Sequence, residues 1–405
     1  MKILLTFIFC LFSLFAFSQN RLPEPKRAVA PLQPKTSPQT TQVYPQRQPN
    51  TINAGGPTSS KRLAPEDSAR NANMQYVERA RNTAVSAPTT PQTTPPANQL
   101  GAGPFVQRVV FSYHYYLDTP NPPVQNWPRE ALGLNKTNLS GRGAVVAVLD
   151  SGVAPHEQFA QGAVSLYDIT GQNKLNDELG HGTSVCAIIA ASGAGSSGFK
   201  GVAPLAKILS YKITRDDGGT SNVLLIKAIE EVIKYNTRHP NNKVNIINIS
   251  YGIGEQNEPL QKALKQAYDS GITIVAPVGN SGQNDVAYPA AYDFVIGVGS
   301  IDNNKQAPSD ASFGQGLDFV APGAELFTPS INNQYIWIRG TSFASAYISG
   351  IAALITEAWQ NKYGSKPSPQ EVYKVMQKIS SPLSSVAAQK QGNGLPDASK
   401  ITASI

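Results

Sequence analysis

The distribution of apolar residues changes near residue 104. From there on, short apolar runs rich in β-branched residues alternate with longer stretches in which apolar residues recur every three or four positions. The short runs lie at 144–149, 208–213, 244–249, 272–278 and 294–298. Continuous apolar runs of this length are typical of strands that are buried on both faces.

Helices are predicted between these strands. One follows the candidate N-caps Thr220 and Ser221 and carries apolar residues at helical spacing, namely Val223, Ile226, Ile229 and Ile233. The next carries Leu260, Ala263, Leu264 and Ala267 and is closed by Gly271. Strands joined by crossover helices predict an α/β fold with a doubly wound, mostly parallel sheet flanked by helices. Such sheets gather their ligands at the carboxyl ends of the strands.

The first residues have the pattern of a secretory signal peptide. Lys2 precedes an apolar run over residues 3–17, and the small residues Ala16 and Ser18 precede a cut before Gln19. The run is shorter than the roughly 20 residues that a membrane span needs. We expect residues 1–18 to be removed and the protein to be secreted or periplasmic, without a transmembrane anchor. An uncleaved anchor is the alternative.

Residues 19–103 are predicted to form a disordered tail or pro-segment. The stretch is rich in Pro, Gln, Thr and Ser, and residues 19–100 hold 13 of the 31 prolines. A short helix near residues 65–85 is the one expected exception. Residues 19–100 also carry ten Lys/Arg against four Asp/Glu, so the net charge of +7 lies almost entirely outside residues 101–405. We therefore predict no specific nucleic-acid binding by the folded region, residues 104–405.

No disulfide bond is expected within the mature protein. Cys10 leaves with the predicted signal peptide, and the one other cysteine, Cys186, lies in an apolar stretch. We expect a buried thiol and a fold that is stabilised by packing alone.

Two candidate catalytic residues lie at junctions between predicted elements. Asp150 ends the first strand, where a carboxylate can orient a base, although such acids also bind metals or cap helices. His181 lies between two glycines at the start of an apolar helix, and the chain has only four histidines. It is a candidate general base, and a helix-capping histidine is the alternative. His156 lies in what is predicted to be a solvated turn and is rejected as the base.

Two further candidates follow. Ser342 lies in a run of small residues, 340–346, that leads into a predicted helix, where its hydroxyl and its N–H can face a substrate carbonyl. Asn280 follows the strand at 272–278 and can donate from its side-chain amide to a developing oxyanion. An ordinary N-cap serine and a turn asparagine are the alternatives. All four candidates fall where a parallel sheet builds its site.

The segments around these residues resemble the motifs of subtilisin-like serine peptidases. Residues 146–153 resemble the aspartate motif, 180–183 the histidine motif and 340–345 the serine motif, in the chain order of that family. The segments 201–204, 288–290 and 321–323 are similar as well. The resemblance covers about residues 120–380, and it implies a subtilisin-like fold and a serine-type endopeptidase.

The resemblance also implies a role for each candidate. Ser342 would attack the scissile carbonyl, His181 would take and return the proton, and Asp150 would hold the imidazole. Asn280 would bind the oxyanion together with the Ser342 N–H. Polypeptides are the expected substrates, and a monomer is expected.

A substrate-binding surface follows from the same resemblance. The implied residues are Ser250, Tyr251 and Gly252 as an edge that pairs with the substrate backbone, Pro277, Val278 and Gly279 as the opposite wall, and Ala287 as the base of the pocket. Since these walls carry no acid, we expect a preference for apolar side chains immediately before the cut.

The chain departs from the family pattern at two places. The serine motif continues as Ser345-Ala346-Tyr347 and lacks the usual proline, which should leave Ser342 in place. Gln158 stands where an aspartate ligand of the family's tight calcium site is expected, and the loop at 192–198 offers no acid or amide. Calcium prefers several oxygen ligands. We therefore predict that this site is missing and that no metal or cofactor is required.

Two other functions remain open. A sedolisin-type acid peptidase has a similar serine motif but a glutamate in place of the histidine and an aspartate at the oxyanion position. His181 and Asn280 argue against it. A catalytically silent binding protein on the same fold is the other, which the intact set of candidate residues disfavours.

Overall fold

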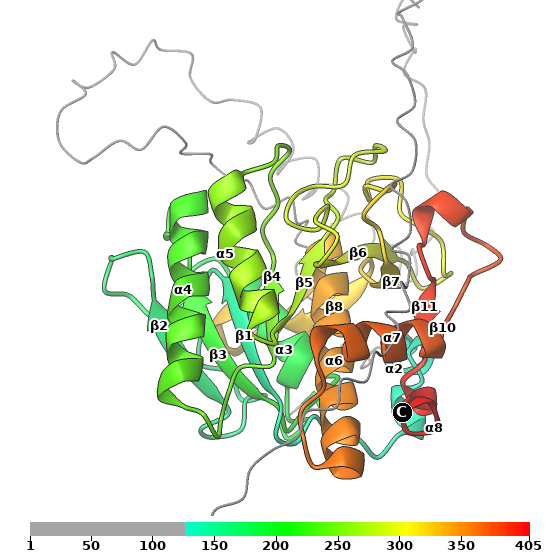
Figure 1. Cartoon of the computed structure of the whole chain (residues 1–405), viewed down its shortest axis with the longest axis horizontal. Helices are drawn as coiled ribbons and strands as arrows, with labels where there is room; N and C mark the ends of the chain where they lie inside the picture. Colours follow the sequence, from blue (N-terminus) through cyan, green and yellow to red (C-terminus); the bar gives the residue numbers. More distant parts are fainter. Residues whose placement is uncertain (1–125, 196) are drawn as a thin grey trace, which may run out of the picture. The chain divides into compact units, whose positions relative to one another are not determined.

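The computed structural model describes residues 126–195 and 197–405 (Figure 1). The predicted signal peptide, the predicted tail with its short helix, and the first residues of the predicted folded region lie outside the described residues.

A seven-stranded sheet forms the centre of the described region, with the strand order β2-β3-β1-β4-β5-β6-β7 (Figure 1). Every neighbouring pair of its strands is parallel. The strands are β1 (Val145–Asp150), β2 (Val164–Asp168), β3 (Lys207–Lys212), β4 (Ile246–Ile249), β5 (Thr273–Pro277), β6 (Ile296–Ile301) and β7 (Phe319–Pro322). The predicted doubly wound parallel sheet is confirmed, and five of its strands lie within a few residues of the predicted runs.

The apolar pattern missed the two edge strands. All five residues of β2 are only half-buried, so a solvated edge does not demand the continuous apolar run that marks a central strand. The strand β7 is buried but only four residues long. A separate antiparallel hairpin, β8 (Leu326–Pro329) with β9 (Tyr335–Ile338), was also not predicted.

Helices flank the sheet in two packed pairs. The pair α4 (Asn222–Arg238) and α5 (Glu258–Asp269) has one apolar face each, and the predicted N-cap is confirmed because Ser221 accepts a hydrogen bond from the Leu224 N–H. The other pair is α3 (His181–Ala190) and α6 (Thr341–Tyr363). Every residue of α3 is buried, and so are the first 18 residues of α6. Helices that are apolar all round belong to the core.

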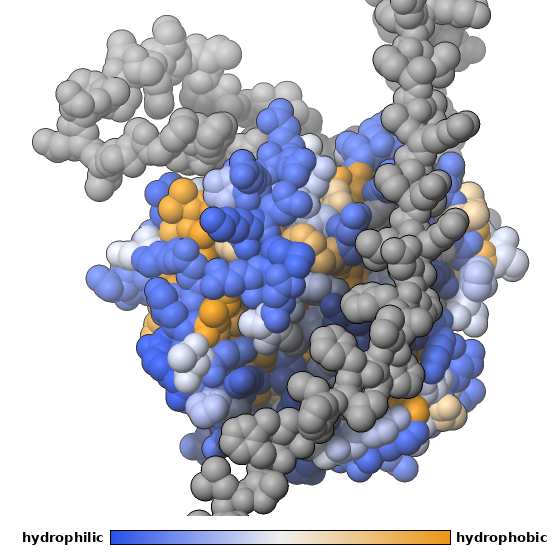
Figure 2. Space-filling model, viewed as in Figure 1, coloured by the Kyte–Doolittle hydropathy of each residue, from blue (hydrophilic) through white to orange (hydrophobic). Residues whose placement is uncertain are grey.

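Shorter elements complete the described region. They are α2 (Trp127–Ala131), η1 (Leu134–Lys136), η2 (Ile331–Asn333), α7 (Pro369–Ile379), β10 (Ser380–Ser381), η3 (Ala388–Lys390), β11 (Leu395–Pro396), η4 (Ala398–Lys400) and α8 (Ile401–Ser404). None of the helices in the described residues is long and apolar enough to cross a membrane. The face seen in Figure 2 is mainly hydrophilic, with apolar residues in small separate patches.

The fold brings the candidate residues to one edge of the sheet. Asp150 is the last residue of β1, Ser250 follows β4 directly, and Val278 follows β5 directly. Since the strands are parallel, these three positions share an edge. Asn280 lies three residues after the end of β5, and the helices α3 and α6 begin at His181 and Thr341, so their first turns carry His181 and Ser342.

Candidate active site

Asp150 and His181 form a buried hydrogen-bonded pair. The imidazole Nδ1 lies 2.8 Å from Oδ1 and 3.0 Å from Oδ2 of Asp150. The carboxylate is 1% exposed and the histidine 3%. Because a carboxylate accepts, Nδ1 carries the proton and Nε2 is left as the basic nitrogen. The histidine is therefore oriented as a general base.

Gly182 permits this close approach. A Cβ at residue 182 would lie 2.2 Å from the carbonyl oxygen of Gly152, so any other residue would force α3 away from the turn after β1. The Gly182 N–H donates to Ser151 Oγ at 2.9 Å, and the Ser151 N–H donates to Asp150 Oδ1 at 2.7 Å. The bond between Gly182 and Ser151 thus joins the start of α3 to the turn after β1, and the bond from Ser151 holds the Asp150 carboxylate.

Asp177 holds the first turn of α3. Its Oδ1 accepts from the N–H groups of Leu179 and Gly180, and its Oδ2 accepts from the N–H and the hydroxyl of Thr183. The hydroxyl of Thr183 in turn accepts from the Ala154 N–H at 3.0 Å. A carboxylate at a helix N-terminus also interacts favourably with the helix dipole. Asp177, four residues before the histidine, thus fixes the position of the helical turn that carries the His181 imidazole.

Lys212 is a buried lysine beneath the same turn, and no motif in the sequence indicates its role. It pairs with Asp150 in the register of β1 and β3 and is 0% exposed. Its Nζ donates to the carbonyl oxygens of Ser151 at 2.9 Å and Asn176 at 3.0 Å, and lies 3.1 Å from Asp216 Oδ1. Since Ser151 follows Asp150 and Asn176 precedes α3, Lys212 ties together the segments that carry the aspartate and the histidine.

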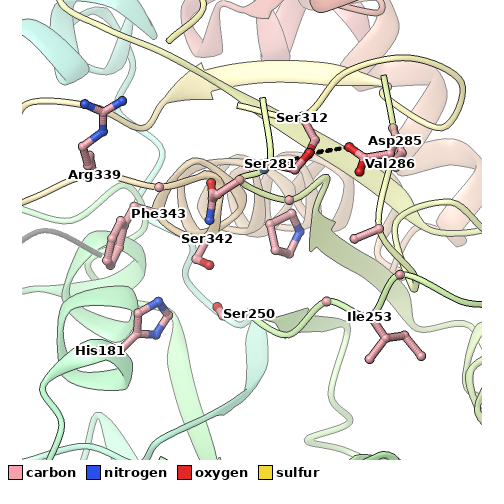
Figure 3. Close-up of a pocket in the computed structure, with 17 residues that line it drawn as sticks. His181, Ser250, Ile253, Ser281, Asp285, Val286, Ser312, Arg339, Ser342 and Phe343 are labelled. Atoms are coloured by element: carbon pink, nitrogen blue, oxygen red, sulfur yellow. Dashed lines mark hydrogen bonds between the residues drawn. The ribbon is translucent and has the colours of Figure 1, made fainter. Parts of the chain in front are cut away.

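A cavity of about 300 Å³ opens in front of His181 and Ser342, and both residues line it. Figure 3 shows the Ser342 side chain directed toward the imidazole. Ser342 lies in the first turn of α6 and is 8% exposed. The hydroxyl of Ser345, one turn along, donates to the Ser342 carbonyl at 2.7 Å, and the Phe343 ring packs against the imidazole with centroids 5.0 Å apart.

Asn280 presents its amide nitrogen to the same cavity. Its Oδ1 accepts from the N–H and the hydroxyl of Thr341, both at 3.0 Å. A backbone N–H can only donate, so these bonds identify Oδ1 and leave Nδ2 as the donor beside the start of α6. Asn280 lines the cavity with Ser342. A donor that is held in this way is suited to stabilise negative charge on a substrate oxygen.

The predicted substrate-binding residues divide into two groups. Five of them line the cavity: Ser250, Gly252, Pro277, Gly279 and Ala287. Tyr251 and Val278 are not among its lining residues; they are 1% and 0% exposed, and the Tyr251 hydroxyl donates to Asn222 Oδ1 at 3.2 Å. Successive side chains of an extended segment face opposite sides, so the middle residue of each wall belongs to the core.

Two glycines and one alanine shape the pocket. A Cβ on Gly252 would lie 3.2 Å from the Ala287 Cβ, and one on Gly279 would lie 3.5 Å from it. The Ala287 N–H donates to the Val278 carbonyl at 2.9 Å. This hydrogen bond connects the bottom of the pocket to one of its walls. The slot between the walls exists because neither glycine has a side chain.

The residues expected to form the walls and the base of the pocket carry no acid, but the cavity extends beyond them. The cavity lining includes an acid, Asp285, at the end farthest from His181 (Figure 3). Its other residues not singled out from sequence are Ile253, Gly254, Ser281, Val286, Ser312, Arg339, Gly340 and Phe343. Asp285 lies two residues before Ala287, the predicted base of the pocket, but its orientation depends on the path of a connecting loop, which no sequence pattern indicates.

The prediction of a solvated turn at His156 is wrong. The side chain is only 8% exposed, since Nδ1 accepts from the Gln158 N–H at 3.2 Å and Nε2 donates to the Gln334 carbonyl at 3.1 Å. Burial lowers the pKa of His156. With both nitrogens engaged away from the cavity, His156 has a structural role, and its rejection as the base agrees with this placement.

Gln158 engages its amide nitrogen in the loop where the family's calcium site is expected. Its Nε2 donates to Ser197 Oγ at 3.0 Å and to the Tyr335 hydroxyl at 2.8 Å, while its Oε1 is buried with no hydrogen-bond partner among the described residues. The Tyr335 hydroxyl itself donates to Glu157 at 2.8 Å. Within the described residues, no group of three or more His, Cys, Asp or Glu could hold a metal ion.

Comparison with known proteins gives consistent matches. Residues 141–394 match the Subtilase family. The chain is 32% identical over 264 residues to the thermostable alkaline protease of Halalkalibacterium halodurans, covering 65% of this chain and 69% of that protein. It is 34% identical over 219 residues to subtilisin DY of Bacillus licheniformis, covering 53% of this chain and 77% of that protein. A third relative, serine protease AprX of Bacillus subtilis, is 32% identical over 260 residues, which cover 55% of this chain and 59% of AprX.

Proposed function

This chain belongs to the subtilase family of serine peptidases, and on that premise we propose that it is an exported endopeptidase whose catalytic triad is Asp150, His181 and Ser342. The observation that carries the proposal is the buried hydrogen bond of 2.8 Å between Asp150 and His181, beside a cavity that Ser342 also lines. Three distant segments of the chain supply the carboxylate, the imidazole and the hydroxyl.

In the proposed reaction, Ser342 Oγ attacks the carbonyl carbon of the scissile peptide bond. His181 Nε2 takes the hydroxyl proton and then gives it to the leaving amine, so that an acyl-enzyme remains. Water, activated by the same nitrogen, hydrolyses the ester and regenerates Ser342. Asp150 keeps the Nδ1 proton in place and stabilises the imidazolium, which forms in a site with little solvent.

Asn280 is proposed as the oxyanion donor, together with the N–H of Ser342. The negative oxygen of the tetrahedral intermediate would lie between these two donors at the start of α6. The two hydrogen bonds from Thr341 to Asn280 Oδ1 support this role, because the amide need not reorient when charge develops.

Polypeptides are the proposed substrates. The segment 250–252 leads away from the end of β4 along the cavity and is the proposed strand partner for the substrate backbone. Pro277 and Ala287, with Val286, give the pocket apolar walls. These walls support a preference for apolar side chains, or side chains with apolar stems, immediately before the cut.

The remaining predictions about the protein's setting stay part of the proposal. The pattern of residues 1–18 supports export, and Gln158 supports activity without calcium in the adjacent loop. A monomer that does not bind nucleic acid specifically is expected. The sedolisin-type reaction is disfavoured by His181 and Asn280, and a silent binding protein by the geometry of the Asp150–His181 pair.

Active-site labelling tests the proposal. A fluorophosphonate should react with the full-length protein at Ser342, and hydrolysis of casein should be lost in parallel. Ser342→Ala should abolish both, whereas Ser270→Ala, an exposed serine at the end of α5, should retain both. A folded protein that neither reacts with the probe nor hydrolyses casein between pH 7 and pH 9 would refute the peptidase function, and activity confined to acid pH would favour the sedolisin-type reaction.

A further inference from the structure

The end of the cavity opposite His181 carries a fixed carboxylate. Asp285 Oδ1 accepts from Ser281 Oγ at 2.5 Å and from Ser312 Oγ at 3.2 Å, and the two hydroxyls lie 2.9 Å apart (Figure 3). All three side chains line the cavity. The serines hold Oδ1 in place, and no hydrogen bond to Oδ2 is found within the described part of the chain.

Asp285 is also the uncompensated charge of the cavity lining. Arg339 lines the cavity too, but its guanidinium forms an ion pair with Asp310. In Figure 3 Arg339 lies beside Phe343, at the end of the cavity away from Asp285. Asp285 forms no ion pair with any residue that the structure describes. The far end of the pocket therefore has negative potential.

The path from Ser342 to this carboxylate is lined by apolar groups. Pro277, Val286 and Ala287 line the same cavity as Ser342 and Asp285, so a side chain that reaches from Ser342 to Asp285 shares the cavity with these apolar groups. A branched or aromatic side chain would end against these apolar groups. An unbranched chain with a cationic end would place its methylenes along them and its charge near the carboxylate, an arrangement that suits lysine.

We propose that Asp285 is a specificity-determining residue, and that its carboxylate selects substrates with lysine immediately before the cut and rejects those with glutamate. The inference rests on the proposed function and names the substrate class of the same site. It adds lysine to the apolar side chains expected from the walls. Two seryl hydrogen bonds orient the carboxylate, so an incoming ammonium does not have to order it.

The expected effect is moderate because Asp285 is exposed. Ion pairs in contact with water contribute little, and salt screens them. We therefore expect the carboxylate to change the relative rate for lysine by about three- to tenfold.

The test compares peptides that differ only at the residue before the cut, with lysine, norleucine or glutamate there. Norleucine is close in shape to lysine without its ammonium group. For the wild-type protein and Asp285→Asn, kcat/KM is measured for each peptide at low and high salt. Asp285→Asn should lower the lysine-to-norleucine ratio about three- to tenfold and raise the relative rate for glutamate. High salt should lower the same ratio in the wild type and leave it unchanged in the variant.

Controls separate this inference from the proposed function. Asp285→Lys should reverse the order of lysine and glutamate, and Asp269→Asn, which removes an exposed acid on α5, should leave all ratios unchanged. An active enzyme whose lysine-to-norleucine ratio is the same in Asp285→Asn would overturn the role of Asp285 alone. Wild-type protein that cleaves no peptide and does not react with the fluorophosphonate would overturn the proposed function as well.

Discussion

The two ends of the cavity are built differently. At the reacting end, Asp150 and His181 are at most 3% exposed, and hydrogen bonds join the strand and the helix that carry them. At the far end, Asp285 is exposed on a connecting segment between β5 and β6, and among the described residues two serine hydroxyls hold it. The first end therefore determines the reaction, whereas substrate preference at the second end can change with single substitutions on the surface.

The largest effect is expected at the buried end, from Asp150→Asn. The Ser151 N–H would keep the side-chain oxygen at the Oδ1 position and leave the new amide nitrogen facing His181. That nitrogen donates, and at the Oδ2 position it lies 3.0 Å from Nδ1, so it favours the tautomer that carries the proton on Nε2 over the one in which Nδ1–H donates to the oxygen 2.8 Å away. The kcat should fall by about 10⁴-fold. Steady-state kinetics measure it, and an undiminished rate would show that Asp150 does not set the tautomer.

A smaller loss is expected between the two ends, from Asn280→Ala. The change removes one of the two proposed oxyanion donors but leaves the Asp150–His181 pair in place. The kcat should fall about 10²- to 10³-fold with little change in KM, because the donor acts on charge that develops only in the transition state. A rise in KM at constant kcat would assign Asn280 to ground-state binding instead.

Lys212→Met tests how firmly the buried end is held. The change leaves the carbonyl oxygens of Ser151 and Asn176 without their donor, although it also removes a buried charge. We expect the free energy of unfolding, measured in urea, to fall by about 2 kcal/mol. Lys174→Met is the matched control, because Lys174 binds the same Asp216 from an exposed position. The control should leave stability almost unchanged, because solvent screens an exposed ion pair, and equal losses in both variants would contradict a special role for Lys212.

The smallest effect is expected from a chelator. Gln158 already donates to Ser197 and Tyr335 in the loop that would hold calcium, so this part of the fold should not need the ion. EDTA should shift the melting temperature by less than about 2 °C, which corresponds to about 1 kcal/mol for a folded region of this size. A large drop, reversed by added calcium, would reveal a site that the sequence and these contacts do not indicate.

The buried end could be predicted from sequence because its residues follow rules of chain order. Strands that are buried on both faces give continuous apolar runs, and the residues directly after them must reach the same edge. Asp150 and Asn280 could be identified in this way, and short motifs added His181 and Ser342. Lys212 was missed because a lysine within an apolar strand does not reveal which carbonyl oxygens it meets.

The directions of side chains at strand ends and in connecting segments could not be predicted in the same way. The inward or outward direction of Tyr251 and Val278 depends on the exact residue at which each strand ends, and a shift of one residue reverses it. Asp285 and His156 lie in connecting segments, where the path of the backbone decides burial and direction. The sequence shows that an acid and a histidine are there, but not which cavity or carbonyl they face.

The helix α6 links the serine to the folding of the whole region. Ser342 is its second residue, and the helix stays buried from Thr341 to Ala358. No local opening can displace the nucleophile without pulling apart a large share of the core. Inactivation by heat or denaturant should therefore coincide with global unfolding, and residual peptidase activity would serve as a direct count of folded molecules.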